Sequence, residues 1–276
     1  GLGTTLDYAV ASHRRAVVLL LLFSLLAFLP GFFQIPPVDR DEARFAQATK
    51  QMLETGEYVD IRFQNEVRYK KPVGIYWLQA AAVKTGEALG VPRPRATIWL
   101  YRLPSLFGAI GAVLLTYWAA LAFVSRRGAL IAALMMASSV LLGVEARLAK
   151  TDAMLLLTSV AAMGAMARIY LACRRAPETP VGWTQPAILW TALAAGTLLK
   201  GPLVLMFVVL AAVTLSVADR SARWLWSLRP VAGFVWMVLL VLPWFVAIVA
   251  KSGGDFFVQA VGHDMLGKVT SGQEAH

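Results

Sequence analysis

Long apolar runs, many of them ended by pairs of basic residues, recur along this chain and limit the folds that it can adopt. Hydrophobic residues make up 58% of the 276 residues and charged residues 15%, whereas about 25% of a typical soluble domain is charged. Several runs reach the roughly 20 residues that an α-helix needs to cross the apolar core of a bilayer. Helices satisfy their own backbone hydrogen bonds in lipid. The sequence therefore predicts an all-α, polytopic membrane protein.

The apolar runs divide into seven predicted crossings. They are residues 16–35, 96–124, 128–148, 153–173, 183–199, 201–218 and 231–250. One division is open, because each half of residues 183–218 is barely long enough to span alone, and the two halves could form one long kinked helix. Proline disfavours continuation of a helix through the residue before it. Gly201-Pro202 therefore favours two helices folded back as a hairpin.

The positions of the basic residues predict the orientation of these crossings. With seven crossings, four basic clusters fall on one side: Arg14-Arg15, Arg126-Arg127, Arg174-Arg175, and Arg220 with Arg223 and Arg229. By the positive-inside rule this side and the amino terminus are cytoplasmic, so we predict a multi-pass inner-membrane protein with a periplasmic active site. The net charge of +10 suits membrane lipids as partners. Nucleic acid is not predicted as a partner, because no basic stripe is interleaved with aromatic residues.

Residues 36–95 are rich in charge and form the predicted first extracytoplasmic loop. Apolar residues along one face predict an amphipathic juxtamembrane helix from Asp41 to Leu53, which Thr55-Gly56 would end. Alternating polarity over residues 58–63 predicts a short extended segment. A second and more apolar helix is expected to begin near Val73 and to lie at the membrane surface.

Two acidic residues on the predicted extracytoplasmic face are candidate catalytic residues, Asp41 as a base and Asp152 as a second acid that could share its cavity. Asp41 belongs to the run Asp39-Arg40-Asp41-Glu42-Ala43-Arg44, shortly after the first crossing. Carboxylates beside a membrane are unfavourable unless they are solvated, paired or functional, and a positioned carboxylate can act as a general base. Asp152 lies in the polar break Lys150-Thr151-Asp152 on the same face. For both residues the alternative is a role at a helix amino terminus.

Basic residues on this face are candidate ligands for a phosphate. They are Arg44, Lys70, Lys71 and Lys200. Arginine offers a bidentate fork and lysine a compact charge, so together they could hold a phosphate; the alternative for each is contact with lipid headgroups. His263 and His276 lack the spacing of a zinc site, and no metal site is predicted. The sequence has no glycine-rich phosphate loop, which argues against an ATP-driven pump.

Six segments of the chain, taken in order, resemble one known family. They are Asp41-Glu42-Ala43-Arg44-Phe45-Ala46, Met52-Leu53-Glu54-Thr55-Gly56-Glu57-Tyr58-Val59, Tyr69-Lys70-Lys71-Pro72, Tyr101-Arg102-Leu103-Pro104-Ser105, Lys150-Thr151-Asp152 and Thr197-Leu198-Leu199-Lys200-Gly201-Pro202. They resemble the GT-C fold polyprenyl-phosphate-sugar glycosyltransferases, which include lipid A aminoarabinose transferases and protein O-mannosyltransferase relatives. The resemblance implies that residues 1–276 are a single transmembrane domain, the amino-terminal part of a longer enzyme.

The resemblance also implies roles for individual residues. Asp41 matches the family's base or acceptor-orienting group, and Asp152 matches an acid placed at the same cavity. Lys71 matches the lysine thought to hold the donor phosphate. Arg44 is placed to assist it, and Lys200 lies in a later motif of the same family.

Glu42, Lys70 and His263 are further candidates, either for contact with the acceptor or for support of the site. Aminoarabinose transferases usually have Glu-Lys-Pro where this chain has Lys70-Lys71-Pro72. The replacement of the glutamate by Lys70 argues against a metal site formed with His263, and against aminoarabinose as the sugar. No cofactor is predicted, and a requirement for a divalent cation is left open.

The predicted function is transfer of a sugar from a polyprenyl phosphate to a lipid, glycan or protein acceptor, with inversion. Cations would stabilise charge on the departing phosphate, and a carboxylate would activate the acceptor. One alternative is a lipid flippase or transporter, which needs no catalytic acid but predicts repeated halves with broken helices. No such repeat is visible in the sequence. A second alternative is a catalytically silent lipid-binding subunit.

Overall fold

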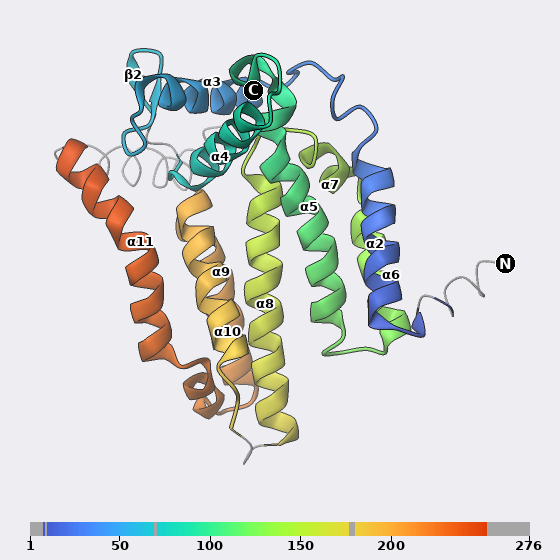
Figure 1. Ribbon diagram of the computed structural model, residues 1–276. Coiled ribbons are helices and arrows are strands. Elements are labelled where there is room, and N and C mark those ends of the chain that lie inside the picture. The colour runs from blue at the N-terminus through green and yellow to red at the C-terminus, as the bar shows by residue number, and fades with distance from the viewer. Residues whose placement is uncertain (1–7, 9, 69–70, 177–179, 253–276) are drawn as a thin grey trace, which may run out of the picture.

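Helices make up almost all of the regular structure in the computed structural model, which describes residues 8, 10–68, 71–176 and 180–252 (Figure 1). The helices are α2 (His13–Phe28), α3 (Arg40–Thr55), α4 (Gly74–Ala88), η1 (Pro94–Ala96), α5 (Ile98–Ala120), α6 (Arg126–Ala137), α7 (Val140–Glu145), α8 (Asp152–Arg175), α9 (Thr184–Lys200), α10 (Leu203–Ala218), η2 (Arg223–Leu228) and α11 (Pro230–Ser252). A short antiparallel hairpin pairs β1 (Arg62–Phe63) with β2 (Glu66–Val67). The predicted all-α fold is confirmed.

The long helices run side by side, and the segment between α2 and α5 lies across one end of the bundle (Figure 1). This end, which carries α3, the β-hairpin and α4, is termed the capped end. The most extensive helix contacts join α8 to α5 and to α9. The helix α8 is therefore central to the bundle, and its first residue, Asp152, lies at the capped end.

Two glycines of α5, Gly108 and Gly111, let this helix pack closely against the start of α8. A side-chain carbon added at Gly108 would lie 2.7 Å from the Met154 backbone nitrogen, and one at Gly111 would lie 2.7 Å from the Leu157 side chain. Even a methyl group would clash at Gly108, because a backbone atom cannot rotate away as the end of a side chain can. The close contact, of the kind that small residues permit between membrane helices, holds the start of α8 against α5.

Three helices among the described residues are long and apolar enough to cross a membrane by length and composition: α5, α8 and α11. The helix α10 is apolar but shorter, and large apolar side chains such as Phe207 and Leu210 are exposed on its surface. Exposed apolar surface of this extent suits contact with lipid. The chain is thus a membrane protein as predicted, while the count of seven crossings stays a prediction.

A sharp turn separates α9 from α10. The helix α9 ends at Lys200, and Gly201 follows it with a positive φ of 71°, a conformation that favours glycine. A side-chain carbon at Gly196 would lie 2.7 Å from Val204, so the two helices fold back against each other. The predicted hairpin is confirmed, and the alternative of one long kinked helix is wrong.

The predicted run 128–148, by contrast, is not one helix. It is divided into α6 and α7 after Ala137. The Ser139 side chain accepts a hydrogen bond from the Leu142 backbone N–H at 3.4 Å, which caps a new helix. Two successive serines therefore interrupt a run whose apolar composition alone predicts continuity.

The first loop folds largely as its sequence predicts. The Asp39 carboxylate accepts hydrogen bonds from the backbone N–H groups of Asp41 at 2.7 Å and Glu42 at 3.1 Å, which caps α3. Gly56 ends the helix in the left-handed conformation. The predicted extended segment is shorter than expected, because only residues 62–63 pair with β2.

Candidate functional site

Charged side chains from four segments gather at the capped end. They are Asp39, Asp41 and Arg44 at the start of α3, Glu145 and Lys150 at the end of α7 and in the following link, Asp152 at the start of α8, and Lys200 at the end of α9. Figure 1 shows α3 and α4 across this end of the bundle, near the start of α8 and the end of α9. The fold therefore assembles residues from distant parts of the sequence.

A buried ion pair anchors this group of residues. The Arg102 guanidinium donates to both carboxylate oxygens of Glu42, at 2.7 and 3.1 Å, and both side chains are 0% exposed. Arg102 also donates to the backbone carbonyl oxygens of Phe32, Ile35 and Pro36, at 3.1, 2.8 and 3.3 Å. A buried charge is tolerated when it is paired and its remaining hydrogen bonds are satisfied. The pair joins the segment after α2 to α3 and α5.

The same carboxylate, together with two polar side chains, holds the link between α7 and α8. Glu42 Oε1 accepts a hydrogen bond from the Ala149 backbone N–H at 3.1 Å. Gln79 of α4 donates to the Ala149 carbonyl oxygen at 3.2 Å, and Ser105 of α5 donates to the Lys150 carbonyl oxygen at 3.1 Å. A satisfied network of buried polar groups favours one arrangement. The backbone that enters α8 is thus held from three helices.

Lys150 connects this link to the start of α3. Its Nζ lies 3.2 Å from Asp39 Oδ2 and 3.8 Å from Glu145 Oε1. Burial lowers the pKa of Lys150, but attraction to Glu145 and Asp39 outweighs burial and holds the pKa above its usual value. Burial raises the pKa of Asp39, but hydrogen bonds from two backbone N–H groups and from Lys150 hold the pKa below its usual value. Both groups are therefore charged at neutral pH.

Asp152, a predicted catalytic residue, is paired with Lys200, a predicted phosphate ligand. Lys200 Nζ lies 2.5 Å from Asp152 Oδ1, and the side chains are 28% and 36% exposed. The Glu145 carboxylate interacts electrostatically with both residues and with Lys150 and Asp39. Its Oε2 atom is buried and has no hydrogen-bond partner among the described residues. These residues form one charged network, which solvent reaches at Asp39, Asp152 and Lys200.

Asp41 lies on the exposed side of the first turn of α3. Its carboxylate is 3.6 Å from Arg44 Nη1, and the Asp41 side chain is 49% exposed. The buried Tyr76 hydroxyl accepts a hydrogen bond from Arg68 Nε at 3.1 Å. Burial raises the pKa of Tyr76 more than the positive charge and hydrogen bond of Arg68 lower it, and the negative charge of Asp41 adds to the rise. Asp39 supplies the side-chain cap of α3, which leaves the Asp41 carboxylate accessible.

Lys71 lies three residues before the first residue of α4 and is half-buried. The start of α4 packs against the end of α9, since a side-chain carbon at Gly74 would lie 2.7 Å from the Leu198 carbonyl oxygen. Lys200 follows Leu198 by two residues. The fold therefore brings the segment that carries Lys71 to the end of α9 that carries Lys200.

The remaining predicted site residues differ in their positions. Glu42 is fully buried and supports the site through Arg102 and Ala149. Lys70 and His263 lie outside the described residues. Within the part of the chain that the structure describes, no group of three or more His, Cys, Asp or Glu side chains could hold a metal ion.

Three charged residues of this end lie within predicted crossings and are absent from the predicted site. They are Arg102, Glu145 and Arg147. Arg147 donates to the backbone carbonyl oxygens of Pro30 at 2.8 Å and Ala27 at 2.6 Å, which ties the link to the end of α2. An ionisable residue inside an apolar run is rare and usually has a role. This signal was available in the sequence for all three residues.

The sequence model of the dolichyl-phosphate-mannose-protein mannosyltransferase family matches residues 18–253. The chain belongs to this family. Two curated relatives, the undecaprenyl phosphate-alpha-4-amino-4-deoxy-L-arabinose arabinosyl transferases of Pectobacterium carotovorum and Erwinia tasmaniensis, are 30% identical over 241 and 245 residues. Each match covers 86% of this chain but only 40% and 41% of the respective relative. The chain thus spans less than half the length of these relatives.

Two solved structures share the fold of this chain. ArnT from Cupriavidus metallidurans in the apo state has a TM-score of 0.76 at 20% identity, covering 89% of this chain and 43% of that one. The same protein bound to undecaprenyl phosphate has a TM-score of 0.78 at 19% identity, covering 92% and 45%. The predicted resemblance to GT-C glycosyltransferases is confirmed.

Proposed function

We propose that this chain forms the catalytic and donor-binding end of a membrane glycosyltransferase. The enzyme would move a sugar from a polyprenyl phosphate to a lipid, glycan or protein acceptor. The observation that carries the proposal is the pairing of accessible carboxylates with cations at the capped end, Asp41 with Arg44 and Asp152 with Lys200. Membership of a mannosyltransferase family that uses a lipid-linked sugar supports it, as do relatives whose name specifies undecaprenyl phosphate.

The reaction needs a proton acceptor and a stabilised leaving group. The acceptor hydroxyl or amine attacks the anomeric carbon, and its proton passes to a carboxylate. The bond between the anomeric carbon and the phosphate oxygen breaks, and the polyprenyl phosphate leaves with the electron pair. A carboxylate accelerates the first event and cations the second. Attack and departure on opposite faces of the sugar in a single displacement invert the anomeric carbon.

The geometry suggests how these roles are divided. Asp41, the more exposed acid, is assigned as the base, and Asp152 as an acid that positions Lys200 and assists the acceptor. Lys71, Arg44 and Lys200 are assigned to the donor phosphate. Each carboxylate neutralises a cation in the free protein. A bound phosphate would compete with these carboxylates for Arg44 and Lys200, because either anion forms charge-assisted contacts with them. Asp41 would then be free to take a proton.

Lys71→Ala in the full-length protein should weaken donor binding about 10- to 100-fold, since a hydrogen bond to a charged group contributes roughly 1.5–3 kcal/mol. Turnover should fall as well, because the same cation would stabilise the departing phosphate. The measurement is binding and consumption of polyprenyl-phosphate sugars. A donor panel that includes undecaprenyl-phosphate aminoarabinose and a polyprenyl-phosphate hexose would also identify the sugar. We expect that it is not aminoarabinose, because Lys70 replaces the glutamate usual in aminoarabinose transferases.

Lys50→Ala is the matched control for this substitution. Lys50 lies on α3 in a solvent-exposed pair with Glu54 at 3.8 Å and should leave donor binding unchanged. Equal losses for the two variants would remove Lys71 from the phosphate site. If the full-length protein consumes no polyprenyl-phosphate sugar but moves lipid between leaflets, the flippase function becomes the better one.

The proposal also places the capped end on the periplasmic face of the inner membrane, with the amino terminus in the cytoplasm. Its support is the position of the basic clusters at the other end of the bundle, at the start of α6, the end of α8 and around η2 (Figure 1). Such clusters favour the cytoplasmic side.

Single cysteines test this orientation in a Cys173→Ser background. In intact spheroplasts, a cysteine at Glu66, in the β-hairpin of the capped end, should react with a membrane-impermeant thiol reagent. A cysteine at Arg127, at the start of α6, should react only after the membrane is permeabilised. Labelling of Arg127→Cys in intact spheroplasts would reverse the orientation.

A further inference from the structure

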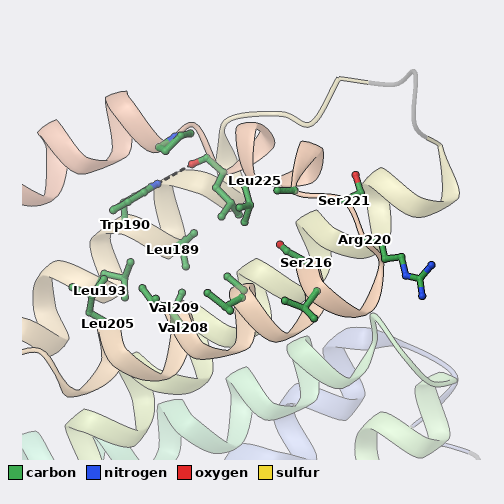
Figure 2. Close-up of a pocket in the computed structure, with 16 residues that line it drawn as sticks. Leu189, Trp190, Leu193, Leu205, Val208, Val209, Ser216, Arg220, Ser221 and Leu225 are labelled. Atoms are coloured by element: carbon green, nitrogen blue, oxygen red, sulfur yellow. Dashed lines mark hydrogen bonds between the residues drawn. The ribbon is translucent and has the colours of Figure 1, made fainter.

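An apolar groove opens at the end of the bundle opposite the capped end. It lies between α9, α10 and η2 and has a volume of about 620 Å³ (Figure 2), within the range of about 300–1,000 Å³ that is usual for ligand sites. Aliphatic side chains such as Leu189, Leu193, Leu205 and Val209 line most of it. The polar N–H of Trp190 is already occupied, because it donates to the Leu228 carbonyl oxygen at 2.8 Å. The groove therefore suits a hydrocarbon chain.

A basic residue lies where the groove meets the end of α10. Figure 2 shows Arg220 at one end of the lining, with its guanidinium directed away from the apolar side chains. The carboxylate of the neighbouring Asp219 accepts a hydrogen bond from the Tyr170 hydroxyl at 2.6 Å and forms an ion pair with Arg174 at 3.1 Å. Within the described ranges, the Arg220 side chain has no ion pair or hydrogen bond. The exposed guanidinium is thus available to an anion at the mouth of the groove.

A neutral polar group lies between the charge and the apolar wall. The Ser216 hydroxyl oxygen lines the groove and is buried without a hydrogen-bond partner in the described part of the chain. Such unpaired buried groups are rare and unfavourable. Ser216 lies in the last turn of α10, and Arg220 lies two residues beyond the end of this helix, so both residues line the same end of the groove. From the mouth inward, the groove offers a cation, a hydroxyl and an aliphatic wall.

We propose that this groove binds one acyl chain of an anionic glycerophospholipid. The phosphate would pair with Arg220, an ester carbonyl oxygen would accept a hydrogen bond from the Ser216 hydroxyl, and the chain would lie along α9 and α10. A polyprenyl phosphate has no carboxylic ester carbonyl and would leave Ser216 unpaired. The groove is separate from the proposed donor site at the capped end, and its lipid does not depend on the proposed function.

Photolabelling of the full-length protein tests this site. The probe is phosphatidylglycerol with a diazirine in the middle of one acyl chain, in phosphatidylethanolamine vesicles. The label should appear on α9 and α10 near residues 189–193 and 205–212. Val209→Trp should fill the groove and abolish this label. Leu210→Trp places the same side chain at the next residue, which is exposed and outside the lining, and should leave the label in place.

The polar contacts have separate tests. Arg220→Ala should lower labelling about fivefold, the size expected for one basic residue at an anionic surface, whereas Arg223→Ala, an exposed arginine outside the groove, should not. A diester phospholipid should compete better than its diether analogue, and Ser216→Ala should remove this difference. If α10 is not labelled in the wild type, another part of the protein covers the groove, and the proposal is overturned. Undiminished labelling of Val209→Trp, or stronger competition by undecaprenyl phosphate, also overturns it.

Discussion

Asp41→Asn in the full-length protein should reduce sugar transfer about 10²–10⁴-fold, the range expected for loss of a general base. The amide keeps the shape of the side chain but cannot take the acceptor's proton. Donor binding should survive, because Lys71 and Lys200 remain and Arg44 is freed from its carboxylate partner. The measurement is product formed from the polyprenyl-phosphate sugar that the donor panel identifies, with donor binding measured alongside.

Two controls separate catalysis from stability in this experiment. Asp39 keeps the cap of α3 in the variant, so the free energy of unfolding should change by no more than about 0.5 kcal/mol, as for other exposed substitutions. Glu54→Gln, which removes an exposed carboxylate from the same helix, should keep normal transfer. If Asp41→Asn transfers sugar at the wild-type rate, Asp41 is not the base and serves only as a favourable negative charge at a helix amino terminus. A large loss in Asp152→Asn alone would then move the base to Asp152.

Glu42→Gln should destabilise the protein by about 3–5 kcal/mol, because it leaves the Arg102 guanidinium buried without a compensating charge. The substitution also weakens the contact to the Ala149 backbone N–H that holds the entry to α8. Activity should be lost together with stability, although Glu42 is assigned no contact with substrate. Thermal unfolding of the purified full-length protein in detergent, followed by loss of the monodisperse species, measures the effect.

The exposed pair between Lys50 and Glu54 is the reference for this prediction. Glu54→Gln should change stability by less than about 1 kcal/mol, the usual range for surface ion pairs. A double variant, Glu42→Leu with Arg102→Met, should be less damaging than the sum of the single changes, because no unpaired charge remains. A small loss in Glu42→Gln, similar to that of Glu54→Gln, would show that the buried pair does not anchor the site.

The sequence alone determined most of the helical segments and where several of them end, although it did not predict the break between α6 and α7. Apolar runs of membrane length need little more than their composition to form helices, since lipid leaves the backbone no other partner. Local chemistry marks the ends: Asp39 supplies the cap of α3, Gly56 ends this helix, and Gly201-Pro202 turns α9 into α10. These signals act within a few residues and can be read without knowledge of the fold. The motifs that carry Asp41, Lys71 and Asp152 are local in the same sense.

Only the tertiary structure decided which charges pair with each other. Lys200 meets Asp152 across 48 residues, Arg102 meets Glu42 across 60, and Lys150 meets Asp39 across 111. No periodicity links such positions, and Asp39, Asp41 and Glu42 are indistinguishable as three acids at one helix start. Packing separates them, because the turn of α3 buries one, caps the helix with another and exposes the third. The proposed roles follow this difference in burial: Glu42, enclosed with Arg102, is proposed to support the site, and the accessible Asp41 is proposed to react.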